Sequence, residues 1–147
     1  MEYLQRLAAY TSWANRLWLD FAYDTAQEEG YLTRLVSHVY LAERVWFQRI
    51  RGEATDKDVF KTQTKVELLD LADQHLHRYS DVLSSDLRRV LTYRRFTGDE
   101  YESALSDILL HLFTHGSHHR GQMASYASQK KLGPPNTDLI TFSRIQD

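Results

Sequence analysis

Apolar side chains recur at intervals of three and four residues over four long stretches of the sequence, and this spacing predicts amphipathic helices. We place these helices at residues 3–24, 31–51, about 65–84 and about 103–131. In the third stretch the apolar positions follow the pattern of a helix that packs along the seam of a bundle; they are Leu69, Ala72, Leu76, Tyr79 and Leu83. The fold class that we predict is therefore all-α, a four-helix bundle.

The connections between these helices differ in character. Residues 53–63 are polar and show no periodicity, so we expect one long connection there. Residues 88–101 carry β-branched and aromatic side chains on both sides of Thr97-Gly98-Asp99, which predicts a small β-hairpin before the last helix. Oxygens of Ser103, or of Ser106 and Asp107, are expected to cap the last helix. We expect one domain over residues 1–147, with the apolar tail residues Leu139, Ile140 and Phe142 packed back on the helices.

The composition argues against several classes of protein. The net charge is −2 and the basic residues are scattered, so we expect no nucleic-acid partner. The densest basic segment, "LRRVLTYRR", is interpreted as a solvated strand face. No run approaches the ~18 apolar residues of a membrane span. The first residues do not resemble a secretory signal. Cysteine is absent, which excludes disulfides and thiolate ligands. These features predict a cytoplasmic protein with no membrane partner.

The segment "HLFTHGSHHRGQ", residues 111–122, contains four of the seven histidines. On a helical wheel His115 and His119 fall on the inward half, whereas His111 and His118 fall on the outer flank. Two imidazoles four residues apart can bind one cation. The alternative is that each ring is buried and hydrogen-bonded to the backbone or to water. The pattern alone leaves both interpretations open.

A third ligand would have to come from another helix. His38 lies at the edge of the apolar stripe of residues 31–51, whereas His75 and His77 flank Leu76 and are expected at the surface. Three imidazoles without a carboxylate leave coordination positions open, as in catalytic zinc sites, where the ion lowers the pKa of bound water or binds a thiolate. Gln122, one turn after His119, is a candidate for supporting the site or binding substrate; alternatively, it is a polar residue at the bundle rim.

Several segments together resemble the DinB / YfiT-like metalloenzyme family, the damage-inducible four-helix proteins. They are "YTSWANRLW", "LVSHVYLAERVWFQRIRG", "LTYRRFTGDEYESALSDILLHLFTHGSHHRGQMA" and "LGPPNTDLITF". The resemblance implies a bundle that binds a divalent metal ion through His38, His115 and His119, and a homodimer. The wider superfamily includes metal-dependent S-transferases and isomerases that use low-molecular-weight thiols such as bacillithiol or mycothiol.

From the histidines and the resemblance together we expect a divalent-metal-binding protein with an open three-histidine site. Its function would be that of a metal-dependent thiol S-transferase or hydrolase acting on a small molecule, in which metal-held water or thiol is the reactive group. Zinc and nickel are the expected ions, with iron, manganese and copper as alternatives; a low-molecular-weight thiol is the expected second cofactor. The competing hypothesis is a non-catalytic stress-response module in which the metal stabilises the bundle.

Overall fold

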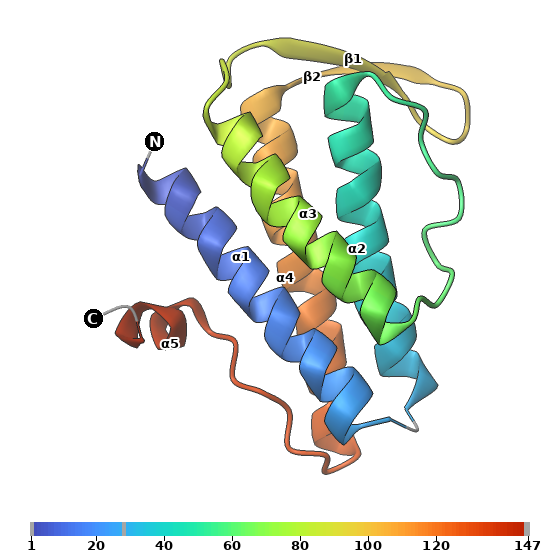
Figure 1. Ribbon diagram of the computed structural model, residues 1–147, viewed down its shortest axis with the longest axis vertical. Coiled ribbons are helices and arrows are strands. Elements are labelled where there is room, and N and C mark those ends of the chain that lie inside the picture. Colours follow the sequence, from blue (N-terminus) through green and yellow to red (C-terminus); the bar gives the residue numbers. More distant parts are fainter. Residues whose placement is uncertain (1, 28, 146–147) are drawn as a thin grey trace.

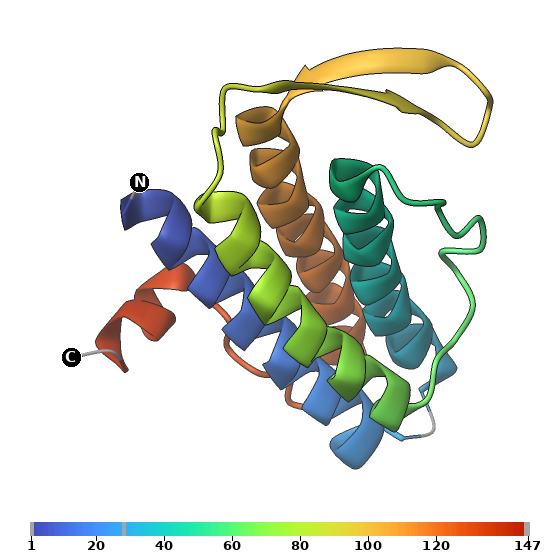
Figure 2. The same cartoon turned by 45° about the horizontal axis from the view of Figure 1, so that its top comes forward.

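The computed structural model describes residues 2–27 and 29–145 of the chain, and this part is largely helical. Four long helices lie side by side, a β-hairpin arches over one end of them, and a short C-terminal helix lies beside the first (Figures 1 and 2). The elements are α1 (Glu2–Asp20), the π-helical turn η1 (Phe21–Thr25), α2 (Gly30–Arg51), α3 (Lys65–Leu83), β1 (Val90–Arg94), β2 (Glu100–Ala104), α4 (Leu105–Gln129) and α5 (Leu139–Arg144).

The long helices and the hairpin occur where the sequence predicted them. The first predicted helix ends earlier as α-helix, at Asp20, and continues as the π-helical turn η1. Residues 53–63 contain no helix or strand, as expected of the long connection, and the hairpin strands pair antiparallel with Val90 opposite Ala104. In the described part of the chain, no helix is both long enough and apolar enough to cross a membrane.

Two groups of buried apolar side chains hold the long helices together. One group, away from the hairpin, includes Trp18, Leu32, Leu68 and Met123, one from each long helix. The other, beneath the hairpin, includes Ala8, Phe47, Val82 and Leu109. Complete burial of each large apolar side chain contributes about 1.5–3 kcal/mol to folding, so the two groups account for the close packing of all four helices.

Between these apolar groups lies a buried polar network centred on the carboxyl group of Glu43. Glu43 Oε1 accepts hydrogen bonds from Asn15 Nδ2 at 3.0 Å and from the Tyr79 hydroxyl at 3.1 Å, and Oε2 lies 2.8 Å from His75 Nδ1. Arg120 Nη1 extends the network by donating to Asn15 Oδ1 at 2.6 Å. Burial, and then the neighbouring Glu43, raise the pKa of Tyr79 well above its ordinary value, so its hydroxyl stays a donor. The network connects all four long helices.

This network corrects the predicted orientation of α3. The sequence pattern placed Leu76 on the buried seam and His75 at the surface, but Leu76 is 51% exposed and His75 only 4% exposed. A buried imidazole is tolerated when it is hydrogen-bonded, and Glu43 supplies that bond from α2. His77 is exposed, as predicted.

The start of α4 also differs from the prediction. The residue before the helix is Ala104, and no side-chain oxygen caps it, so neither Ser103 nor Ser106 nor Asp107 has the expected capping role. Instead, the Leu105 amide donates to the Arg89 carbonyl at 3.0 Å, and the Ser106 amide donates to the Leu87 carbonyl at 2.9 Å. The backbone that leads into the hairpin thus satisfies amides that a capping side chain would otherwise bind.

The C-terminal segment packs back on the helices through one residue of the predicted apolar patch. Phe142 is buried, with its ring 5.9 Å from that of Tyr10 and 5.4 Å from that of Trp13. Leu139 and Ile140 are exposed, contrary to the prediction for them. The contact fixes α5 against α1, and Figure 1 shows the two helices side by side.

We predict that Glu43→Ala lowers the free energy of unfolding by about 3 kcal/mol or more, because it leaves three buried donors without their acceptor. Tyr79→Phe removes a single bond to the same carboxyl group and should cost about 1 kcal/mol. Urea unfolding monitored by circular dichroism measures both. Equal losses for the two variants would contradict a central role for Glu43.

Candidate functional site

Three histidines from two helices lie together on the side of the molecule formed by α2 and α4. His38 belongs to α2, and His115 and His119 lie one turn apart on α4. One ring nitrogen from each lies within 4.8 Å of those of the other two, so the group could hold a metal ion. The predicted convergence of these three residues is therefore present.

The outer nitrogens of two of these rings are held by hydrogen bonds. His38 Nδ1 lies 2.9 Å from the Val59 carbonyl oxygen, and His119 Nδ1 lies 2.7 Å from Gln122 Oε1. Because both partners are acceptors, each Nδ1 carries the proton, and each Nε2 keeps its lone pair. Metal-binding histidines commonly have such a partner, which fixes the ring orientation and the tautomer. His119 Nε2 faces His115 Nε2 at 3.1 Å.

The histidine group is uncharged near neutral pH. Burial, together with the neighbouring rings, of which His119 acts most strongly, lowers the pKa of His115 to about 3. Burial also lowers the pKa of His38 and of His119. Neutral imidazole is the form that binds a metal ion. The donor set, its convergence and its protonation therefore all fit a divalent ion that accepts nitrogen ligands.

The long connection between α2 and α3 covers part of this group. The Phe60 ring stacks on the His38 ring, with centroids 4.3 Å apart and planes 4° from parallel. Val59, the residue before it, supplies the carbonyl that holds His38. Sequence reasoning treated this connection only as a polar loop. The feature that could have revealed its contact with His38 is the apolar pair Val59-Phe60 within an otherwise polar stretch.

The other two histidines of α4 lie beside the group and are exposed. The His118 ring is 5.2 Å from that of His119, and the His111 ring is 5.6 Å from that of His115 and 5.3 Å from that of Trp46. Neither belongs to the group that could share one ion. The helical wheel separated the two pairs in the same way.

Sequence reasoning missed Arg120, which is buried although it follows His119 directly. Its side chain extends inward to Asn15, and Gly116 provides the space: a Cβ at Gly116 would lie 3.0 Å from Arg120 Nη1. A glycine inside a helix, four residues before an arginine, was the available signal. Because successive residues of a helix are rotated by about 100°, an inward Arg120 places His119 toward α2.

The lowered pKa of His115 predicts a pH dependence of the metal-free protein. The folded state binds fewer protons than the unfolded state between about pH 6.5 and pH 3, so the free energy of unfolding should fall as the pH falls through this range. Urea unfolding of chelator-treated protein from pH 7 to pH 4 measures the slope. His115→Ala should flatten it, whereas His77→Ala, an exposed histidine on α3, should not. An identical slope in all three proteins would contradict the assignment.

No curated protein matches the sequence. The sequence does match the DinB family, over residues 4–147, which include α2, α4 and all three histidines of the group. The match covers essentially the whole chain and agrees with the resemblance inferred from its motifs. The chain belongs to the DinB family.

Proposed function

We propose that the protein is a four-helix-bundle metalloprotein that binds one divalent ion through His38, His115 and His119, and that it acts as a metal-dependent thiol S-transferase or hydrolase. The observation that carries this proposal is the convergence of three neutral imidazoles on one point, with the outer nitrogens of His38 and His119 already held. Zinc and nickel are the proposed ions, and iron, manganese and copper are the alternatives.

A divalent ion held by three imidazoles and no carboxylate retains its full charge and open coordination positions, and so supplies Lewis acidity toward a thiol or a water molecule. The chain contributes orientation and shielding. The Val59 carbonyl and Gln122 fix the tautomers of His38 and His119, which is the supporting role that we propose for Gln122. Phe60 covers one face of His38 and limits access of water from that side.

The alternative function is a stress-response module in which the ion serves only to link α2 to α4. Two observations favour the catalytic role. Apolar groups pack at both ends of the helices, and the Glu43 network already joins all four of them, so the packing does not depend on an ion. In addition, His115 and His119 are only half-buried, which leaves their shared face accessible to a small molecule.

The remaining expectations belong to the same proposal. We propose a homodimer that is located in the cytoplasm, uses a low-molecular-weight thiol and has neither a nucleic-acid nor a membrane partner. The scattered basic residues and the net charge of −2 support the absence of a nucleic-acid partner.

Metal analysis of tag-free protein tests the ligand set. His38→Ala, His115→Ala and His119→Ala should each lose most of the bound metal, because each removes one of three ligands, whereas the wild-type protein should hold about one ion per chain. His118→Ala is the matched control: it removes an adjacent exposed imidazole and should keep the wild-type metal content. Full metal content in His115→Ala and His119→Ala would end the three-histidine proposal.

Cobalt substitution separates the catalytic role from the structural one. If the site has an open position, adding a small thiol to the cobalt-loaded protein should produce a thiolate-to-cobalt absorption band in the near ultraviolet. Chelation should leave the helical circular dichroism signal in place. The structural role would be favoured if the protein unfolds on chelation and if adding a thiol leaves the cobalt spectrum unchanged.

A further inference from the structure

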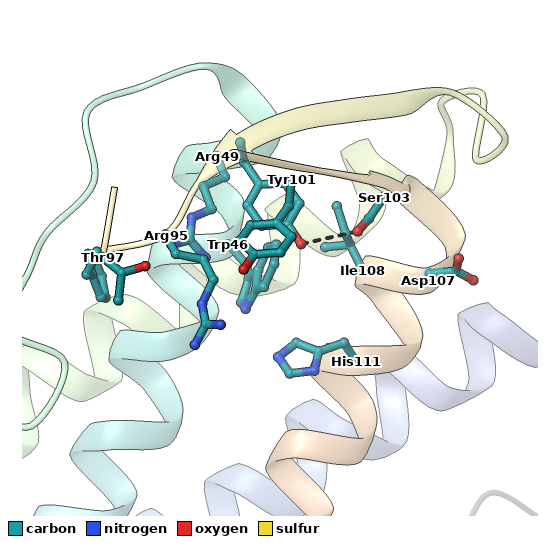
Figure 3. A pocket seen from close by; sticks show the side chains of 11 residues that line it. Trp46, Arg49, Arg95, Thr97, Tyr101, Ser103, Asp107, Ile108 and His111 are labelled. Carbon is teal, nitrogen blue, oxygen red and sulfur yellow. Dashed lines mark hydrogen bonds between the residues drawn. The ribbon is translucent and has the colours of Figure 1, made fainter. Parts of the chain in front are cut away.

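We propose that the pocket beneath the hairpin binds a small organic anion with a flat unsaturated body, and that it places this molecule beside the histidine group. The proposal rests on the proposed function, since it names the substrate class for the same site. The pocket has a volume of about 720 Å³, and its walls come from α2, the hairpin and the start of α4 (Figure 3). That volume is within the usual range for small-molecule sites.

The walls of the pocket are rich in aromatic rings. The Trp46 ring of α2 lies 5.0 Å from that of Tyr93 at an angle of 70°, and the Tyr93 ring lies 6.3 Å from that of Tyr101 across the hairpin. Phe96, near the tip, is 50% exposed. Rings that are partly open to solvent in a concave wall offer a stacking surface to a flat ligand.

Two arginines of the pocket provide positive charge. The Arg49 guanidinium lies 4.7 Å from the centre of the Trp46 ring and 5.3 Å from that of Tyr93, and its Nη2 donates to the Arg94 carbonyl at 3.2 Å. Its Nε is buried and has no hydrogen-bond partner within the described residues. The Arg95 guanidinium lies 5.8 Å from the centre of the Tyr101 ring.

These two charges are not neutralised by the protein. Within residues 2–27 and 29–145, neither Arg49 nor Arg95 forms an ion pair with a carboxyl group. The acidic residue of the lining is Asp107, and its carboxyl group points away from both arginines (Figure 3). Burial lowers the pKa of Arg49, the neighbouring Tyr93 raises it, and the positive charge of Arg95 lowers it. Two guanidinium groups without a carboxyl partner, one half-buried and one exposed, favour binding of an anion.

The arrangement refines the interpretation of "LRRVLTYRR" as a solvated strand face. Arg88 and Arg94 do pair with acidic neighbours at the surface, Asp86 and Glu100 respectively. Arg95, the last arginine of the segment, instead lines the pocket. Its side chain and that of His111 extend into the same space from opposite walls (Figure 3).

His111 connects the pocket to the histidine group. It lines the pocket and lies one turn before His115 on α4, with the two rings 5.6 Å apart. A molecule whose anionic group contacts Arg49 and Arg95 and whose flat body rests on Trp46 could therefore extend along α4 to His115. This placement makes the pocket a substrate site of the metal centre rather than a separate cavity.

Titration of the full-length protein with two simple probes, benzoate and phenyl phosphate, tests the proposal. Benzyl alcohol is the neutral control of similar shape. Binding is followed by the change in tryptophan fluorescence and by the nuclear magnetic resonance signals of the probe. The Trp46→Phe variant shows which part of the fluorescence change comes from Trp46. We expect at least one anion to bind saturably and benzyl alcohol to bind about tenfold more weakly or not at all. Preference between the two anions identifies the carboxylate or the phosphate as the favoured group.

Arg49→Gln and Arg95→Gln should each weaken binding of the preferred anion about tenfold, because each removes a charged donor. Arg88→Gln, which changes an exposed arginine outside the pocket, should leave binding unchanged. Arg95 is exposed on the hairpin, so its variant tests the pocket even if Arg49→Gln disturbs folding. No saturable anion binding, equal binding of benzyl alcohol, or wild-type affinity in Arg95→Gln would overturn the proposal.

The same titration with chelator-treated protein and with His115→Ala separates this proposal from that of the metal site. Anion binding that persists in both, in a protein that holds no metal under any condition, would support the pocket and end the metal proposal. Stoichiometric metal binding without anion binding would support the metal proposal and overturn the pocket proposal.

Discussion

The arrangement of the helices depends on the hydrogen bonds of the buried Glu43 carboxyl group. It belongs to α2, accepts hydrogen bonds from α1 and α3, and is linked through Asn15 to Arg120 of α4. Apolar packing is non-directional and tolerates rotation of a helix about its axis, whereas these bonds do not. The network therefore fixes which face of each helix is inward. On α4 this matters directly, because Arg120 and His119 are consecutive.

The histidine group follows from that rotation. With Arg120 directed to the interior, His115 and His119 face α2, and His38 meets them there. The three rings differ from His75, which has a carboxyl partner in the interior. Among residues 2–27 and 29–145 no carboxyl group pairs with them, and their burial keeps them neutral. The molecule thus separates its four buried or half-buried histidines into one that stabilises the helix packing and three whose lone pairs remain available to a ligand.

The sequence predicted the parts of the structure that depend on periodicity. The long helices and the inward pair His115/His119 follow from local spacing, and the hairpin follows from β-branched and aromatic residues on both sides of a Thr-Gly-Asp turn. His38 followed from its position at the edge of an apolar stripe and from the family resemblance. The rotation of α3 could not be predicted, because the choice between His75 and Leu76 is made by Glu43, 32 residues earlier. The contribution of Val59 and Phe60 was hidden for a similar reason: an irregular loop has no period, and its contact with His38 is tertiary.

The way in which α4 begins has a consequence for how such a protein can change over evolution. The first amides of α4 are bound by the carbonyls of Leu87 and Arg89, main-chain atoms that every amino acid possesses. Substitutions in β1, β2 and the turn between them can therefore alter the pocket walls without shifting the helix that carries His115 and His119. The lining of the pocket can then diversify among descendants while the histidine group is inherited unchanged.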